Sequence, residues 1–243
     1  MVTEADTILR FFDTHTHLLP GMDDGSSSLD ESIRMLDIMK QQGVTHVCLT
    51  SHYYPFREPV TRYLERRDSS FEQLKPELEK RGIIALLGAE VRLSDELFNL
   101  DSMDELCLGD SRLLLLEPPF RQPVTQEMVN QIERFATQFY VRPVIAHFNR
   151  YDLFKDAKLR DQLRDIGCYL QMNLEALHSG PLVRRRALKL IRDGEVDMLG
   201  SDSHNLAARK PNIAESIDVI SKDSALISEF KHIYERTCEL LGQ

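Results

Sequence analysis

Seven short apolar runs alternate with longer amphipathic stretches along the chain. The runs span residues 8–15, 45–52, 83–90, 111–118, 142–148, 168–173 and 196–204. Each run is nearly continuous in apolar residues, which is typical of strands that are buried on both faces of a parallel sheet. The pattern therefore predicts an α/β fold in which each strand is followed by a helix.

The stretches between these runs carry helical patterns. The first predicted helix, over 29–43, has a capping box made by Ser28 and Glu31 and a stop signal at Gly43. Further helices are predicted over 125–139, 180–194 and 223–241. The segment 59–81 also has a helical pattern, but Pro76 is expected to break or restart that helix because proline removes a backbone donor.

Seven evenly spaced strand–helix units favour closure into a barrel over an open sheet. The 243 residues suit one domain that spans 1–243, and a hydrophobic content of 42% is sufficient for a sizeable core. We therefore expect a single domain with a distorted, TIM-like (βα)7 barrel.

Composition excludes several classes of protein. The longest apolar runs are too short to span a bilayer, and the N-terminal segment lacks the order of a signal peptide, so we expect a cytoplasmic protein without membrane insertion. The net charge of −9 argues against a nucleic-acid partner. The four cysteines form no Cys-x-x-Cys pair and are expected to be buried apolar residues.

Polar residues gather where the predicted strands end. They are His15, His17, His52, Glu90, Glu117, His147, Asn173, Asp202 and His204. The carboxyl ends of parallel strands meet at one face of a barrel, so these side chains should converge. A lone histidine at a strand end is usually structural, but burying so many ionisable groups together is costly unless metal ions compensate their charge. Nitrogen and oxygen donors without thiolate suit Mn, Fe or Zn, and the number of ligands predicts two or three ions.

Several motifs together resemble a known superfamily. The segments "DTHTHLLPGMDDG", "TSHYYP", "GAEVRL", "LLLEPPF", "VIAHFNRY" and "GSDSHN" are similar to those of the polymerase-and-histidinol-phosphatase (PHP) superfamily. They are most similar to its bacterial tyrosine-phosphatase branch from capsule and exopolysaccharide gene clusters. The resemblance extends from about residue 12 to about residue 215.

The resemblance implies a cluster of Mn²⁺ ions, with Fe or Zn as alternatives, that serves the hydrolysis of phosphotyrosine. It implies as substrate the C-terminal tail of a tyrosine autokinase of polysaccharide synthesis, and it makes a homo-oligomer plausible. By position, the implied metal ligands are His15, His17, Asp24, His52, Glu90, Glu117, His147, Asp202 and His204, with Asp24 preferred to Asp23. Arg150 and Arg209 match the phosphate-contacting arginines, and His204 is also a candidate proton donor to the leaving group.

The chain departs from the pattern of the family beside the site. It has "HFNR" where many members have His-Pro-Glu-Arg, and "TSHYY" where many have Thr-Pro-His-His, which bears on substrate preference. In the loop 53–59 an aromatic wall for phosphotyrosine is an alternative to plain loop packing. For "RRR" at 184–186 a docking surface for an acidic partner, or an oligomer contact, is an alternative to a solvated helix face. A small-molecule PHP phosphatase, for histidinol phosphate or a similar ester, and a non-catalytic regulatory PHP module are the competing functions.

Overall fold

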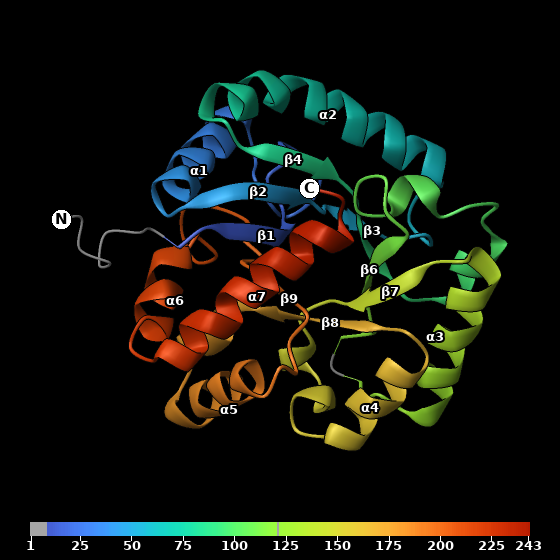
Figure 1. Ribbon diagram of the computed structural model, residues 1–243. Coiled ribbons are helices and arrows are strands. Elements are labelled where there is room, and N and C mark those ends of the chain that lie inside the picture. Colours follow the sequence, from blue (N-terminus) through green and yellow to red (C-terminus); the bar gives the residue numbers. More distant parts are fainter. Residues whose placement is uncertain (1–8, 121) are drawn as a thin grey trace.

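The computed structural model describes residues 9–120 and 122–243, within which parallel strands curl into a distorted barrel (Figure 1). The strands are β1 (Phe11–Thr16), β2 (Val44–Leu49), β3 (His52–Tyr53), β4 (Ile84–Leu87), β5 (Glu90–Arg92), β6 (Leu113–Glu117), β7 (Arg142–Ile145), β8 (Tyr169–Asn173) and β9 (Met198–Gly200). They pair in the orders β1-β2-β4 and β3-β5-β6-β7-β8-β9. A parallel bridge between Thr16 and Ser203 returns the second sheet to β1.

Two of the seven predicted strands are each divided into two pieces. The run 45–52 gives β2 and β3, and the run 83–90 gives β4 and β5, so the chain leaves one sheet and joins the other within each run. At the second crossing, a Cβ on Gly88 would lie 2.7 Å from the end of the Leu108 side chain, so a larger residue there would require Leu108 to move. The seven strand positions make the predicted distorted (βα)7 barrel, and each division distorts its wall.

Helices surround the strands on the outside (Figure 1). They are α1 (Leu29–Gln41), α2 (Val60–Arg81), α3 (Gln126–Phe139), α4 (Ala157–Asp165), α5 (Pro181–Arg192), α6 (Ile213–Ile220) and α7 (Ser224–Leu240), with short 3-10 turns η2 (Asp95–Asn99), η3 (Asp104–Leu106), η4 (Phe148–Arg150), η5 (Asp152–Phe154) and η6 (Leu174–Leu177). The predicted helices are confirmed to within about two residues at each end, whereas α4 and α6 were not predicted. Both are short, so each carries little hydrophobic periodicity.

Two details of the helix predictions are corrected. The Ser28 hydroxyl accepts from the Glu31 backbone N–H at 3.3 Å, but the Glu31 carboxylate accepts from the backbone N–H of Ser27, one residue before the predicted partner. The predicted break at Pro76 is wrong, because α2 runs through it without interruption. Pro76 lies on the exposed side of α2, where water can satisfy the carbonyl that loses its partner, while Leu74 and Leu78 hold the buried side.

The core has two layers because alternate strand residues face opposite ways. Residues such as Leu114 and Leu116 pack between the strands and the outer helices, whereas Leu115 and Val144 belong to a second cluster, which also includes Phe12 and residues of α7. In Figure 1, α7 crosses in front of β1 and β9. The amino end of the barrel is thereby filled with apolar side chains, and polar side chains occupy the carboxyl end.

No helix in the described part of the chain has both the length and the apolar composition needed to cross a bilayer. The prediction that the N-terminal segment is not a signal peptide falls mainly on residues 1–8, which lie outside the described residues.

Candidate metal centre

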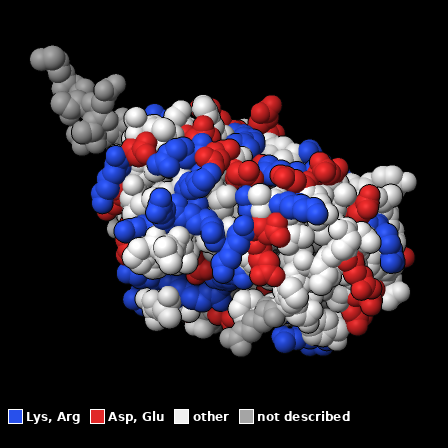
Figure 2. Space-filling model, turned by 90° about the horizontal axis from the view of Figure 1, so that it is seen from below, with Lys and Arg blue, Asp and Glu red and all other residues white. Residues whose placement is uncertain are grey.

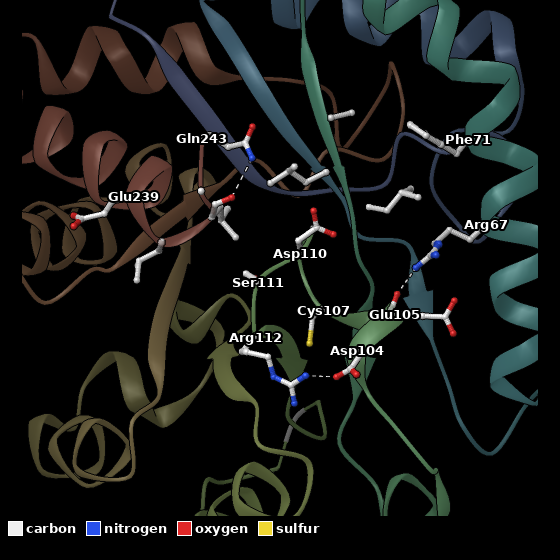
Figure 3. Close-up of a pocket in the computed structure, with 17 residues that line it drawn as sticks. Arg67, Phe71, Asp104, Glu105, Cys107, Asp110, Ser111, Arg112, Glu239 and Gln243 are labelled. Carbon is white, nitrogen blue, oxygen red and sulfur yellow. Dashed lines mark hydrogen bonds and ion pairs between the residues drawn. The ribbon is translucent and has the colours of Figure 1, made fainter.

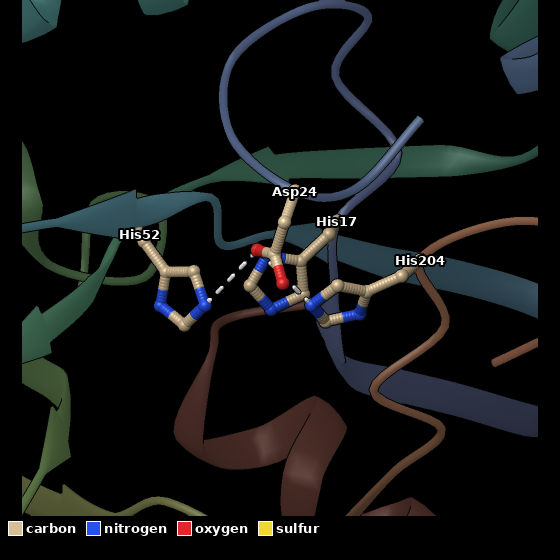
Figure 4. Close-up of side chains that lie close together, drawn as sticks. All are labelled: His17, Asp24, His52 and His204. Carbon is tan, nitrogen blue, oxygen red and sulfur yellow. Dashed lines mark ion pairs between the residues drawn. The ribbon is translucent and has the colours of Figure 1, made fainter. Parts of the chain in front are cut away.

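All the strand-end residues predicted as ligands meet at the carboxyl end of the barrel. Eight of the nine predicted ligands place their ligating atoms in three groups: His17, Asp24, His52 and His204; His15, His17 and Asp202; and His52, Glu90 and Glu117. His147, the ninth, joins them through Glu90. Figure 4 shows the first group, in which the Asp24 carboxylate lies between the rings of His52 and His204. Its Oδ1 is 3.4 Å from His52 Nε2 and 3.6 Å from His204 Nε2.

Glu90, which is 1% exposed, lies at the junction of these groups. Its Oε2 is 3.2 Å from His15 Nε2, 3.3 Å from His17 Nε2 and 2.9 Å from His52 Nδ1. Its Oε1 is 2.8 Å from His147 Nε2, which in turn lies 3.8 Å from Glu117 Oε1. A carboxylate with both oxygens among imidazole nitrogens can bridge neighbouring ions.

The neighbours of three histidines direct their Nε2 atoms toward the centre. His17 Nδ1 lies 2.8 Å from Asp23 Oδ2, His204 Nδ1 lies 2.9 Å from the backbone carbonyl of Asp202, and His15 Nδ1 lies 3.4 Å from Gln171 Oε1. An acceptor at Nδ1 fixes the tautomer that leaves the Nε2 lone pair available for a metal.

The structure assigns different positions to the two adjacent aspartates. Asp23 also accepts from the His52 backbone N–H at 2.7 Å, so it ties the loop after β1 to β3 and supports His17 from outside the centre. Asp24 instead directs its carboxylate at His52 and His204. This geometry favours Asp24 as a metal ligand, and it favours Asp23 as the residue that holds His17 in place.

Backbone geometry at the centre is unusual. His147 and Asp202 both have left-handed backbone conformations, with φ of 33° and 54°, which residues other than glycine rarely adopt. They are held by short hydrogen bonds: the His147 N–H donates to Gln171 Oε1 at 2.6 Å and the Asp202 N–H donates to the His15 carbonyl at 2.8 Å. Strain of this kind is maintained where the surrounding structure fixes the position of functional side chains.

Two glycines allow the ligand-bearing segments to approach each other. A Cβ on Gly25 would lie 2.4 Å from the Cβ of His17, and a Cβ on Gly200 would lie 2.6 Å from the Cβ of His15. Both distances are too short for any side chain, so the glycines of the "DDG" and "GSDSH" segments are required by packing against the two histidines.

Electrostatics couple the buried groups to one another. Burial alone would lower the pKa of His17, but the charge of Asp23 and the nearby carboxylate of Asp202 raise it well above its usual value. Burial opposes ionisation of Glu90, but His15 and His52 hold its pKa well below the usual range. Without metal, protons on imidazoles therefore balance the carboxylates, and metal binding would release them.

His204 differs from its neighbours, because burial, followed by the charge of His17, lowers its pKa to about 3. A neutral imidazole is the form that binds a metal. Its Nδ1 already faces a carbonyl and its Nε2 faces the cluster, so the ring has no free N–H to give to a leaving group. The geometry favours the ligand role of His204 over the predicted role of proton donor.

The donor set fits divalent ions. Three buried atoms that face the centre, Glu90 Oε2, Asp202 Oδ1 and His204 Nε2, have no hydrogen-bond partner in the described part of the chain. An unpaired buried carboxylate oxygen is costly, and a cation at the centre would remove that cost. Imidazole and carboxylate donors, with no thiolate among them, suit Mn, Fe or Zn.

Two arginines form the rim of the centre on one side. Arg150 Nη2 and Arg209 Nη2 lie 2.9 and 2.7 Å from Asp202 Oδ2, while Oδ1 of the same carboxylate faces His15 and His17. Arg150 also donates from Nε to Glu175 at 2.8 Å. Both guanidinium groups are partly exposed, so they can contact an anion that enters the mouth.

Aromatic side chains of the loop after His52 form the wall on another side. The Tyr54 ring stacks on His52 with ring centres 5.1 Å apart, and the Arg57 guanidinium covers Tyr54 at 4.3 Å. Phe56 is 54% exposed beside Tyr54. Tyr53, which the sequence made another candidate for this wall, is only 1% exposed and is therefore removed from the candidates.

Sequence reasoning missed two residues at the site. Arg92 forms an ion pair with Glu117 at 2.7 Å, and the buried Gln171 contacts both His15 and His147. Each stands two residues from a strand-end residue already noted, Glu90 or Asn173, and therefore on the same side of its strand. This spacing is the signal that could have found them.

A large cavity lies away from the metal centre (Figure 3). It has a volume of about 950 Å³ and is lined by Arg67, Cys107, Arg112 and the C-terminal residues 239–243, among others. The Arg112 guanidinium donates hydrogen bonds to Asp104 and to the backbone carbonyls of Phe139 and Tyr140. Burial raises the pKa of Cys107 to about 12, so this pair is not the reactive cysteine and arginine of a cysteine-dependent phosphatase.

The other cysteines are also unsuited to nucleophilic chemistry. Cys48, Cys107 and Cys168 are buried, as predicted, whereas Cys238 is partly exposed. Burial raises the pKa of both Cys48 and Cys168, which is expected of inert thiols that pack as small apolar groups.

Comparison with known proteins agrees with the geometry. The model of the family "Capsular polysaccharide synthesis, CpsB/CapC" matches residues 11–233. The chain belongs to this family. It is 29% identical to the tyrosine-protein phosphatase CpsB of Streptococcus pneumoniae over 224 residues, which are 86% of this chain and 89% of that protein. It is 27% identical to the tyrosine-protein phosphatase YwqE of Bacillus subtilis (strain 168) over 244 residues, 94% of this chain and 90% of that one.

Solved structures share the fold of this CpsB/CapC family member. One from a study of YwqE of Bacillus subtilis and CpsB of Streptococcus pneumoniae, described as metal-dependent tyrosine phosphatases, has a TM-score of 0.76 with 24% identity and covers 96% of this chain and 95% of its own. A phosphotriesterase homology protein of Escherichia coli has a TM-score of 0.54 with 11% identity, over 96% and 99% of the two chains. The branch predicted from the motifs is confirmed.

Proposed function

We propose that this protein is a metal-dependent protein-tyrosine phosphatase. The observation that carries the proposal is the convergence of nine His, Asp and Glu side chains, Glu90 among them, with Arg150 and Arg209 at the rim. An imidazole–carboxylate centre bordered by guanidinium groups suits the hydrolysis of a phosphate monoester. The relatives named tyrosine-protein phosphatases support phosphotyrosine as the ester.

The cofactor in this proposal is Mn²⁺, two or three ions for each chain, with Fe or Zn as alternatives. The residues that would hold it are His15, His17, Asp24, His52, Glu90, Glu117, His147, Asp202 and His204. Divalent ions bound there would activate water and neutralise charge on the phosphoryl group. The four carboxylates carry fewer negative charges than three divalent ions carry positive ones, so the loaded centre would attract a phosphate dianion despite the net charge of −9 on the chain.

The residues of the rim have separate tasks. Arg150 and Arg209 share one carboxylate oxygen of Asp202, so both guanidinium groups are already held toward the centre and can donate to phosphate oxygens as charge develops on them. Glu175 holds Arg150 from the outer side. The tyrosine leaving group has a pKa of about 10 and can depart with little help from an acid, which agrees with the lack of a free N–H on His204.

The wall made by Tyr54, Phe56 and Arg57 favours an aryl ester over a small alkyl ester. Tyr54 is fixed between His52 and Arg57, and the exposed Phe56 extends this surface outward. An aromatic ring whose phosphate lies at the centre could pack against this wall, and pairs of aromatic rings contribute roughly 0.5–1.5 kcal/mol beyond area burial. The physiological substrate in this proposal is the phosphotyrosine-bearing tail of a kinase of capsular or exopolysaccharide synthesis.

Hydrolysis by chelator-stripped protein tests the proposal. A phosphotyrosine peptide is incubated with and without added Mn²⁺, beside an Asp202→Ala variant and with histidinol phosphate as an alternative substrate. We expect peptide hydrolysis that returns with Mn²⁺ and is absent from the variant. Cleavage of histidinol phosphate alone would replace the tyrosine-phosphatase assignment with that of a small-molecule phosphatase. No hydrolysis with any metal would leave the regulatory module as the better interpretation.

A further inference from the structure

The first two turns of α5 expose side chains that its packing does not require. The inner side of this helix packs through its buried residues Ala187, Leu190 and Ile191. Leu182 is nevertheless 83% exposed and Val183 is 38% exposed, and the three arginines that follow, 184–186, are exposed as well. We call residues 182–186 the α5 patch.

The charges of the α5 patch are not balanced within the described part of the chain. Later in the same helix, Lys189 pairs with Asp193 and Arg192 pairs with Asp223. Neither Arg184 nor Arg185 has a carboxylate partner among residues 9–120 and 122–243, and the first turn of α5 contains no acidic residue. Arginines near a helix N-terminus oppose the helix dipole at a cost of a few tenths of a kcal/mol, so helix stability does not explain them.

The α5 patch lies on the same end of the barrel as the metal centre. Strand β8 ends at Asn173, which donates to Asp202, and Glu175 in the following turn accepts from Arg150. Leu182 is seven residues beyond Glu175, so it lies within about 25 Å of the rim, the reach of an extended chain of that length. Figure 2 shows Lys and Arg side chains gathered on the side of the molecule where α5 lies, although the chain carries a net charge of −9.

We propose that the α5 patch docks an acidic segment of the phosphotyrosine protein while a phosphotyrosine of the same protein occupies the metal centre. This inference rests on the proposed function and names a property of its substrate. The unpaired arginines complement aspartates, glutamates or a second phosphotyrosine, and Leu182 complements an apolar residue between them. Self-association through a symmetric interface centred on the α5 patch is disfavoured, because it would bring the arginines of two copies together.

Charge reversal on α5, with a matched control on α2, tests the docking surface. Arg184→Glu/Arg185→Glu and Lys75→Glu/Lys80→Glu change the net charge equally, and all four side chains are exposed. The substrates are p-nitrophenyl phosphate, a phosphotyrosine peptide with neutral flanks, and one whose flanks of about eight residues are rich in Asp and Glu. Binding of the acidic peptide to chelator-stripped protein is followed by fluorescence anisotropy, so docking is measured even if hydrolysis is absent.

We expect the α5 variant to raise KM and Kd for the acidic peptide about tenfold, with kcat and the hydrolysis of p-nitrophenyl phosphate unchanged. Wild-type preference for the acidic peptide should decline with added salt. Equal behaviour of the two variants on the acidic peptide, or equal losses on the small ester and the peptide, would overturn the docking site. Patch-dependent binding to vesicles of phosphatidylglycerol, with peptide binding unchanged, would replace the acidic peptide with an anionic membrane.

If wild-type protein hydrolyses none of the substrates but the anisotropy difference persists, the proposed function fails and the docking surface stands. If hydrolysis is normal and the anisotropy difference is absent, the docking surface fails and the proposed function stands. Circular dichroism and Tm of each variant verify that the fold is intact before either comparison is made.

Discussion

The two ends of the barrel treat their polar groups in opposite ways. At the carboxyl end, buried carboxylate oxygens such as Glu90 Oε2 and Asp202 Oδ1 have no hydrogen-bond partner in the described part of the chain. In the cavity of about 950 Å³ elsewhere, both arginines already have partners within the protein: Arg67 reaches Asp68 and the Glu105 carbonyl, and Arg112 reaches Asp104. A large cavity is therefore not in itself a sign of reactivity.

This difference shows which property marks a functional site. Volume alone would select the cavity in Figure 3. Buried ligand atoms that lack hydrogen-bond partners instead point to the crowded centre in Figure 4, where a bound cation would compensate many donors at once. The following predictions test this contrast, from the largest expected effect to the smallest.

The largest effect is expected from Glu90→Gln. Loss of the shared charge at the junction of the three groups should lower kcat/KM for a phosphotyrosine peptide by about a thousandfold or more, equivalent to about 4 kcal/mol. The matched control is Glu105→Gln, at an exposed side chain that lines the other cavity, which should keep activity within about twofold. Similar losses in both variants would contradict the contrast.

Asp23→Asn should have an intermediate effect. It keeps the shape of the side chain but weakens the support of His17 Nδ1, so we expect metal affinity to fall by about 10- to 100-fold. Titration with Mn²⁺ under metal-buffered conditions measures this change. Activity should recover at high Mn²⁺, whereas a loss that saturating Mn²⁺ does not reverse would indicate that Asp23 acts in catalysis or is itself a ligand.

Tyr54→Ala tests the aromatic wall. Without the ring that stacks on His52, KM for a phosphotyrosine peptide should rise by about three- to tenfold, and hydrolysis of a non-aromatic phosphomonoester should change little. Tyr54→Phe is the control and should retain wild-type kinetics, because it keeps the ring. Equal losses on both kinds of ester in Tyr54→Ala would show that the ring only supports His52.

Arg112→Ala tests the opposite end through stability. Removing a guanidinium that binds two backbone carbonyls and Asp104 should lower the free energy of unfolding by about 1–2 kcal/mol, measured by urea denaturation. Arg112 is partly exposed, so water screens its interactions, and the expected loss of stability is small for a residue with three partners. Activity at 25 °C should be unaffected, and a loss of activity in folded protein would link this cavity to the reaction.

The smallest effect is expected from Cys107→Ser. Burial keeps this thiol protonated, and the chemistry assigned to the metal centre does not use it. Phosphotyrosine hydrolysis should be within about twofold of wild type, with a modest loss of stability from a polar group in an apolar site. A phosphoenzyme trapped on cysteine during turnover would contradict the metal-dependent assignment.

The barrel and the convergence of the strand-end side chains could be predicted because both depend on one-dimensional patterns. Apolar runs at regular spacing give strands, and the carboxyl ends of those strands must meet, so His52, Glu90 and His147 could be brought together without coordinates. The pair His15 and His17 follows from the alternation of side chains along a strand.

Other features depend on the path of the chain in three dimensions. Asp23 and Asp24 are adjacent in one loop, and only its course shows that the first supports His17 while the second faces His52. The continuity of α2 through Pro76 depends on which side of the helix faces water. The division of two predicted strands between the sheets depends on which strands pair with each other in three dimensions.

The most direct test of the central claim is the metal content of purified protein, measured by inductively coupled plasma mass spectrometry after loading with Mn²⁺ and desalting. We predict two to three ions for each wild-type chain, the same number for Glu105→Gln, and fewer than one for Glu90→Gln, whose side chain contacts ligands of all three groups. A wild-type chain that retains no metal, or a Glu90→Gln variant that retains the full number, would contradict the account.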